Sequence, residues 1–331
     1  MAQEQGLNLH PVHHVMANQR PEKVKIRQLW INQAILHAEQ NTDSTAPLYS
    51  TLSGHEGHEF RLLHEVGLLQ LTETGAVESS CLHKFIAIEQ NATAYASLST
   101  KFPGLKIVRE SIQSIVLGHT KLRYPVGEVE KICRSKIINL DLNEPWMPRL
   151  QEGQWIIPTC RWIEKFAELH ASNPKLHWTL LLTLHGECPW SMDAQSVISA
   201  KINDLFHTYP AQIATVQGWI GKELLTNIRN NHEIDFSTVP KLLQQKLLMW
   251  VVPMCVALAC RQQGWAINIL ENIHYGQHPE HAPMVSWIID FQIPTRQALT
   301  FEPELRNCLE TILDRAAHIK NDGEIQYYHN D

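Results

Sequence analysis

Three short apolar runs in this sequence each end on a carboxylate. The run KFIAIE ends at Glu89, LKIVRE ends at Glu110, and IINLD ends at Asp141. Runs of this kind predict buried strands of a parallel sheet, whose carboxyl ends meet along one edge. Carboxylates accept hydrogen bonds from hydroxyl and amino groups, and several carboxylates gathered without cations repel one another. The pattern therefore predicts one crevice that binds a ligand rich in hydroxyl and amino groups.

A glycine-containing turn follows the first predicted strand. The sequence LSGHEG places Ser53, Gly54 and Gly57 at the end of the run 46–54 and before a predicted helix. Glycine lets the backbone approach a ligand closely because it has no Cβ. Two glycines that open a helix also occur without any ligand, so this turn by itself leaves both interpretations open.

Polar residues and aromatic rings lie near the same edge. The string Asn143-Glu144-Pro145-Trp146 follows the run 135–142, and Pro145 stiffens the turn expected there. Tryptophan rings near the crevice either stack on a base or pack in the core. The tryptophans in question are Trp146, Trp155, Trp162 and Trp190.

The surrounding elements alternate between strands and helices, which predicts an α/β fold with a doubly wound, mostly parallel sheet. Strands are expected at 46–54, 84–89, 105–110, 135–142 and 176–186, and helices at 24–40, 58–69, 92–102, 160–171 and 193–206. Residues 266–276 and 283–293 lie too close in sequence for a crossover helix, so they predict an antiparallel strand pair at the end of the sheet. The expected organisation is an N-terminal tail and helix (1–45), an α/β domain (46–300) with helical additions at about 211–263, and a C-terminal helix (303–320) with its tail (301–331).

Strand–helix units that end in an antiparallel strand pair resemble the class I S-adenosylmethionine-dependent methyltransferases, in a divergent form. The resemblance covers roughly residues 46–293 and implies S-adenosylmethionine as the cofactor. It implies cofactor contacts from Ser53, Gly54 and Gly57 at the methionine part, from Glu89 at the ribose, and from Glu110 and Ser111 at the adenine. It implies catalytic roles for Asp141 and Asn143 and substrate contacts for Pro145 and Trp146.

The implied activity is methyl transfer to an amine or nucleobase acceptor. The sequence departs from the family at Ser53, where an acid is usual, and at Glu144, where a first proline is usual. These departures favour an alternative, a catalytically inactive methyltransferase-like subunit that acts as a binding or assembly module. A nicotinamide-dependent oxidoreductase is disfavoured because the first turn lacks G-x-G-x-x-G.

Other chemistries have weaker signals. His55, Glu56, His58, Glu59 and His64 are close in sequence but do not form H-E-x-x-H, so no metal site is predicted. The sequence contains no G-x-S-x-G elbow and no phosphate-binding G-x-x-x-x-G-K-[ST] loop.

Composition indicates a cytoplasmic protein. The 331 residues are 44% hydrophobic with a net charge of −6, and the seven cysteines include no C-x-x-C pair. The negative charge argues weakly against a non-specific nucleic-acid binder, while a specific nucleic-acid or protein partner stays open. The apolar stretch 247–260 contains a proline and is too short to span a bilayer, so we expect a core helix and no membrane association. The sequence leaves the oligomeric state open.

Overall fold

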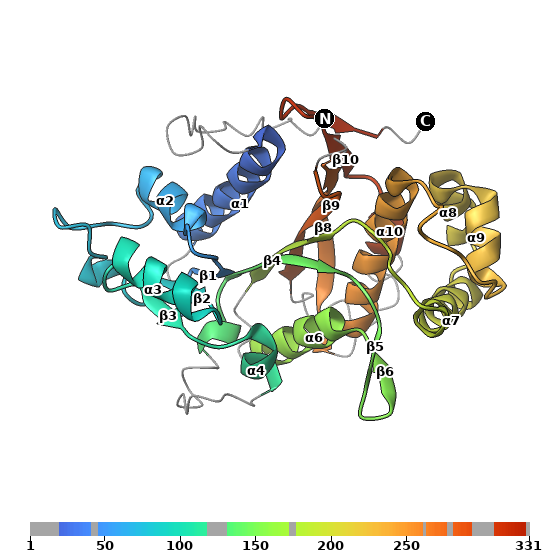
Figure 1. The fold of residues 1–331 in the computed structure, drawn as a ribbon, viewed down its shortest axis with the longest axis horizontal. Coiled ribbons are helices and arrows are strands. Elements are labelled where there is room, and N and C mark those ends of the chain that lie inside the picture. Colours follow the sequence, from blue (N-terminus) through green and yellow to red (C-terminus); the bar gives the residue numbers. More distant parts are fainter. Residues whose placement is uncertain are drawn as a thin grey trace.

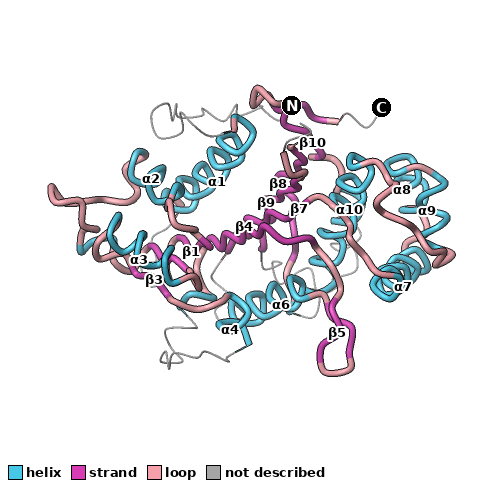
Figure 2. Tube along the Cα trace, in the orientation of Figure 1, coloured by secondary structure: helices cyan, strands magenta, loops and turns pink. Residues whose placement is uncertain are grey.

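The computed structural model describes residues 20–40, 46–117, 131–171, 177–260, 263–276, 281–292 and 308–328, except for the side chain of Asn143. Figures 1 and 2 show a sheet with helices on both sides. The strands are β1 (Tyr49–Leu52), β2 (Phe85–Ile88), β3 (Lys106–Val108), β4 (Ile137–Pro145), β5 (Arg149–Gln151), β6 (Gln154–Ile156), β7 (Trp178–His185), β8 (Ala266–Tyr275), β9 (Met284–Gln292), β10 (Ala316–Ile319) and β11 (Ile325–Tyr327). The helices are α1 (Pro21–Glu39), α2 (His58–Glu65), α3 (Ala92–Lys101), α4 (Ile112–Leu117), α6 (Pro158–Ala171), α7 (Met192–Thr208), α8 (Gln212–Ile220), α9 (Lys222–Arg229) and α10 (Lys241–Cys260), with a short 3-10 helix at Ser79–Cys81.

Nine strands form one mostly parallel sheet in the order β11-β10-β8-β9-β7-β4-β1-β2-β3. Strands β3, β2, β1, β4 and β7 are parallel neighbours, as expected for alternating strands and helices. Strand β9 lies antiparallel between β7 and β8. The predicted α/β class and the antiparallel strand pair are therefore confirmed, and this arrangement differs from the all-parallel order 3-2-1-4-5-6 of dinucleotide-binding sheets.

Helices cover both faces of the sheet, so β2 and β7 are buried at successive positions. In β7, Leu180, Leu182 and Leu184 belong to a core shared with α4, α6, α7 and α10, whereas Leu181 faces a second core beneath α1, α2 and α3. This alternation follows from the two-residue period of a strand. Figure 1 shows α1 and α2 on one side of the sheet and α4 and α6 on the other.

The C-terminal end differs from the expectation. The predicted helix over 303–320 is wrong at its end, because residues 316–319 form β10, which pairs in parallel with β8 and antiparallel with β11. Residues 301–307 lie outside the described residues. The sequence also predicts a turn at Pro145, but β4 continues to Pro145 with an irregularity after Asp141.

Two further features bear on the sequence predictions. The two-stranded β5–β6 hairpin, which no pattern predicted, turns at Glu152 and Gly153, both with positive φ. Helix α10 is long and apolar enough to cross a membrane by length and composition, but 72% of its apolar window is buried inside the protein. Such burial is typical of a core helix, in agreement with the prediction for 247–260.

Candidate functional site

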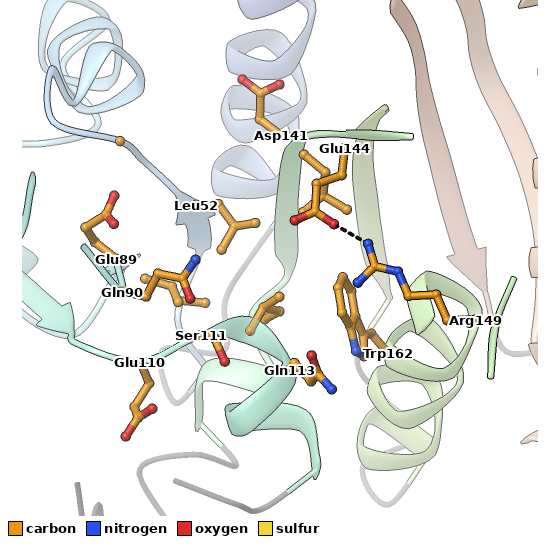
Figure 3. Close-up of a pocket in the computed structure, with 14 residues that line it drawn as sticks. Leu52, Glu89, Gln90, Glu110, Ser111, Gln113, Asp141, Glu144, Arg149 and Trp162 are labelled. Carbon is orange, nitrogen blue, oxygen red and sulfur yellow. Dashed lines mark hydrogen bonds and ion pairs between the residues drawn. The ribbon is translucent and has the colours of Figure 1, made fainter. Parts of the chain in front are cut away.

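A cavity of about 310 Å³ lies at the carboxyl ends of β1, β2, β3 and β4. It is lined by Leu52, Gly54, Ile88, Glu89, Gln90, Glu110, Ser111, Ile112, Gln113, Asp141, Leu142, Glu144, Arg149 and Trp162 (Figure 3). The structure thus brings five of the predicted residues to one place, namely Gly54, Glu89, Glu110, Ser111 and Asp141. Of the other predicted residues whose side chains the structure describes, Ser53, Gly57, Pro145 and Trp146 do not line this cavity.

The glycine turn has two parts with different roles. Gly54 lines the cavity with φ of +55°, and a Cβ placed there would meet nothing within 4 Å. Gly57 precedes α2 with φ of +59°, and a Cβ there would lie 2.7 Å from the Phe102 ring and 2.8 Å from Leu98. Gly57 is therefore required for the packing of the turn against α3, and only Gly54 is placed to meet a ligand. Ser53 is buried beside it, and its hydroxyl has no hydrogen-bond partner.

Glu89 follows β2 and is partly held by the chain. Its Oε1 accepts a hydrogen bond of 2.7 Å from the backbone N–H of Asn91, and the Asn91 side chain in turn caps α3. Each carboxylate oxygen has two lone pairs, so this bond fixes the side chain and leaves acceptor capacity for a ligand. Gln90 extends toward the cavity beside Glu89 (Figure 3) and offers both a donor and an acceptor.

Glu110 and Ser111 follow β3. Glu110 lines the cavity, although it is only 6% exposed and Figure 3 shows its carboxylate directed away from the centre of the group. The Ser111 hydroxyl accepts from the backbone N–H of Ser114 at 3.0 Å and donates to the Ser114 hydroxyl at 2.9 Å. Ser111 therefore caps the first turn of α4 and places that turn against the cavity.

Asp141 is bound to a residue that the sequence pattern did not connect with it. Lys23 of α1 donates to both carboxylate oxygens at 2.7 Å, and the two side chains are 16% and 18% exposed. Burial acts to lower the pKa of Lys23, but Tyr275 and Asp141 outweigh it, so that this pKa is raised above 10.5. Figure 3 shows the Asp141 carboxylate directed toward the helix above the cavity. Asp141 contributes to the wall of the cavity while its charge is balanced by Lys23.

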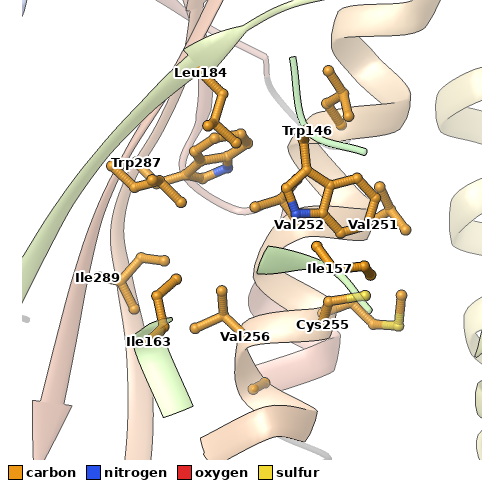
Figure 4. Packing of buried hydrophobic residues seen from close by; sticks show 14 of the residues in the cluster. Trp146, Ile157, Ile163, Leu184, Val251, Val252, Cys255, Val256, Trp287 and Ile289 are labelled. Carbon is orange, nitrogen blue, oxygen red and sulfur yellow. The ribbon is translucent and has the colours of Figure 1, made fainter. Parts of the chain in front are cut away.

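The string after Asp141 contributes an ion pair at the cavity and a buried tryptophan. Asn143 lies in β4, Glu144 accepts from Arg149 of the β5–β6 hairpin at 3.0 Å, and this ion pair lies at the cavity (Figure 3). Trp146 is fully buried, its ring 6.0 Å from that of Trp190. Figure 4 shows Trp146 packed among residues of α10 and the sheet. Trp146 therefore packs in the core.

The sequence patterns missed several lining residues. Leu52, Ile88, Ile112 and Leu142 supply an apolar surface, and Gln113 and Arg149 supply donors. Ile88 and Leu142 belong to the apolar runs beside Glu89 and Asp141, so their position next to a predicted strand end was the available signal. Of the four tryptophans for which stacking and core packing were both open, Trp162 of α6 is the one that lines the cavity.

A second ion pair lies beside the Lys23–Asp141 pair. Arg27 of α1 donates from Nε to Glu59 of α2 at 3.0 Å, and the Glu59 side chain is only 4% exposed. Burial raises the pKa of Glu59, against the opposing effect of Arg27. Helix α1 thus contributes two cations at the edge where the cavity lies.

The chemistry of the cavity suits a nucleoside with a cationic end. Its volume is near the lower limit of small-molecule sites, which hold about 300–1,000 Å³. Apolar side chains and Trp162 can contact a base, and carboxylate and amide groups can accept from hydroxyl and amino groups. Four carboxylates and one guanidinium line it, so the balance of charge favours a cation even after Lys23 is included.

No protein-family model matches the chain, and no curated protein sequence matches it. Among solved structures, the chain is similar to a modification subunit of a type I restriction enzyme from Vibrio vulnificus, with a TM-score of 0.32 and 9% identity over 85% of this chain and 51% of that one. The chain spans about half the length of that subunit. The α/β fold is shown by the sheet order, and the candidate site by the residues that line the cavity.

Proposed function

We propose that this chain binds S-adenosylmethionine in the cavity at the carboxyl ends of β1 to β4 and transfers its methyl group to an amine or nucleobase. The observation that carries the proposal is that four strand ends contribute to one cavity, with Gly54, Glu89, Glu110 and Asp141 among its lining residues. Ligands of doubly wound sheets bind outside the carboxyl ends of the strands.

The residues fit the parts of this cofactor. Glu89, fixed by Asn91, would accept from the ribose hydroxyls. Ile112, Leu142 and Trp162 would contact the adenine ring, and Gly54 would let the backbone approach the methionine part. The excess of carboxylates favours the sulfonium and ammonium charges. The chain would then accelerate transfer chiefly by aligning the acceptor with the methyl group.

A second function, a methyltransferase-like binding or assembly module without catalysis, is supported by a specific observation. Trp146 is buried and Asp141 is engaged by Lys23, so neither group is free to position an acceptor. Under this alternative the cavity still binds S-adenosylmethionine, and a nucleic-acid or protein partner contacts the chain elsewhere. The two functions therefore agree on the cofactor and differ in turnover.

Isothermal titration of the full chain with S-adenosylmethionine and S-adenosylhomocysteine tests cofactor binding. We expect one site, and Glu89→Gln should weaken binding about 10- to 100-fold, because hydrogen bonds to charged groups contribute about 1.5–3 kcal/mol each. The glutamine keeps an oxygen that can accept from Asn91. Glu56→Gln is a matched control, because Glu56 lies in the glycine turn between β1 and α2, pairs with Lys101 and does not line the cavity.

Transfer of a labelled methyl group to DNA, RNA or protein fractions then separates the two functions. Binding with transfer supports the enzyme, and binding without transfer supports the module. Absence of binding in the wild type, or equal affinity of Glu89→Gln and Glu56→Gln for the cofactor, would overturn the assignment of this cavity.

A further inference from the structure

Three side chains with metal-binding atoms converge at the edge of the sheet opposite the cavity. They are His37 in the last turn of α1, His177 just before β7, and Asp290 near the end of β9. Their candidate ligand atoms all lie within 4.8 Å of one another. The three residues come from segments far apart in the sequence, so the fold itself brings them together.

The contacts within the group show how closely it is arranged. His177 Nε2 contacts Asp290 Oδ1, and the rings of His37 and His177 have centroids 4.9 Å apart. His37 Nε2 lies 2.7 Å from the Thr179 hydroxyl, which donates to Asp290 Oδ1 at 3.1 Å. Two imidazoles and one carboxylate therefore surround a common point.

Neighbouring side chains fix the Asp290 carboxylate by hydrogen bonds, as is usual for carboxylates that bind metal ions. Thr179 donates to Oδ1 of Asp290, and the Gln292 amide donates to Oδ2 at 2.7 Å. Both His37 and Asp290 are buried, while the side chain of His177 is 39% exposed. Such fixed carboxylates and one accessible side are typical of metal sites that an ion can enter from solvent.

We infer that His37, His177 and Asp290 form a site for a divalent transition metal, with Zn²⁺ the best match. Two histidines and one carboxylate are a common ligand set for Zn²⁺, and water completes the coordination. The ion would replace the His37–Thr179 and His177–Asp290 hydrogen bonds. The charge of Lys136 acts on His37, so the expected affinity is moderate, below that of a closed site with four protein ligands.

The position of the site assigns it a structural role. It lies at the amino end of β7, whereas the proposed cofactor cavity lies at the carboxyl ends of the strands. A metal here would tie the last turn of α1 to β7 and β9. This inference does not depend on the proposed function.

Zinc titration of the full, tag-free chain after dialysis against a chelator tests the site. We expect one Zn²⁺ per chain, a raised Tm, and Co²⁺ substitution that gives a visible d–d absorption band. His177→Gln and Asp290→Asn should each weaken binding at least tenfold, since even outer-shell changes weaken metal binding about 10- to 100-fold. His207→Gln, an exposed histidine at the end of α7, serves as the matched control.

The control decides among the outcomes, because 17 of the 19 histidines lie outside the proposed site and can also bind zinc. Loss of binding in both site variants with retention in His207→Gln supports the site. Absence of stoichiometric binding in the wild type would show that the cluster is a hydrogen-bond network only. Unchanged binding in His177→Gln and Asp290→Asn, with both variants folded by circular dichroism, would place the zinc elsewhere and overturn the inference.

Discussion

Replacing Lys23 by methionine removes the cation that balances Asp141 while keeping most of the side-chain volume. At the observed separation of 2.7 Å, Coulomb's law with an effective dielectric constant of about 20 gives an attraction of about 6 kcal/mol, before the cost of removing both groups from water. Removing one partner of a fully buried pair costs about 3–5 kcal/mol. These two side chains are 16% and 18% exposed, so the cost is smaller than for a fully buried pair. We expect Lys23→Met to lower the free energy of unfolding by about 2–4 kcal/mol.

Urea denaturation at pH 7.5 measures this change, and two further variants interpret it. Lys101→Met breaks a more exposed ion pair with Glu56, and it should lower the free energy of unfolding by less than about 1 kcal/mol. The double variant Lys23→Met/Asp141→Leu should recover most of the loss, because apolar replacement of a whole buried pair is often nearly neutral. A loss for Lys23→Met no larger than that for Lys101→Met, or no recovery in the double variant, would refute the reasoning.

The same pair predicts a dependence on pH. The pKa of Lys23 is raised above 10.5 in the folded protein. Its contribution is therefore complete below pH 10.5 and is lost as the pH rises through the raised pKa. The difference in stability between the wild type and Lys23→Met should shrink above pH 10.5.

Two further predictions concern stability. Gly57→Ala should lower the free energy of unfolding by about 3 kcal/mol, because of the positive φ and the contact with Phe102. Gly54→Ala should lower it by only about 1–2 kcal/mol, because nothing lies near its Cβ. Equal losses of the two variants in thermal unfolding would contradict the assigned roles. Burial raises the pKa of Glu271 from 4.5 to about 7, so its stabilising contribution is complete below pH 4.5 and is lost as the pH rises through 7. Stability should fall by about 3 kcal/mol between pH 4 and pH 8 through this group, and Glu271→Gln should remove that part of the slope; an unchanged slope in urea titrations would contradict it.

The sequence predicted the sheet well where local pattern and burial agree. The runs that became β2, β4 and β7 are apolar at successive positions because both faces of the sheet are covered. Residues 316–319 were assigned to a helix because their apolar spacing suited one, and pairing with β8 determined the outcome. That pairing joins positions more than 40 residues apart, which local periodicity does not encode.

Only part of the candidate site could be predicted, because local sequence shows strand ends but not contacts between distant residues. Strand ends are visible in a sequence, so Glu89, Glu110 and Asp141 were found as lining residues before the fold was known. Lys23 is 118 residues from Asp141, and no spacing connects the two. The burial of Trp146 could not be predicted, because a tryptophan after a strand looks the same in sequence whether it faces the solvent or the core.

Helix α1 carries Lys23, Arg27, Trp30, Ala34 and His37 at successive intervals of four and three residues, and these positions face the sheet. The fourteen residue steps from Lys23 to His37 make almost four turns of about 3.6 residues, so both ends of the stripe lie on nearly the same side of the helix. One residue inserted after Ile31 would rotate the two ends by about 100° relative to each other. Either Asp141 would lose Lys23 or Thr179 would lose His37. The spacing of residues along α1 therefore allows one helix to bind both edges of the sheet.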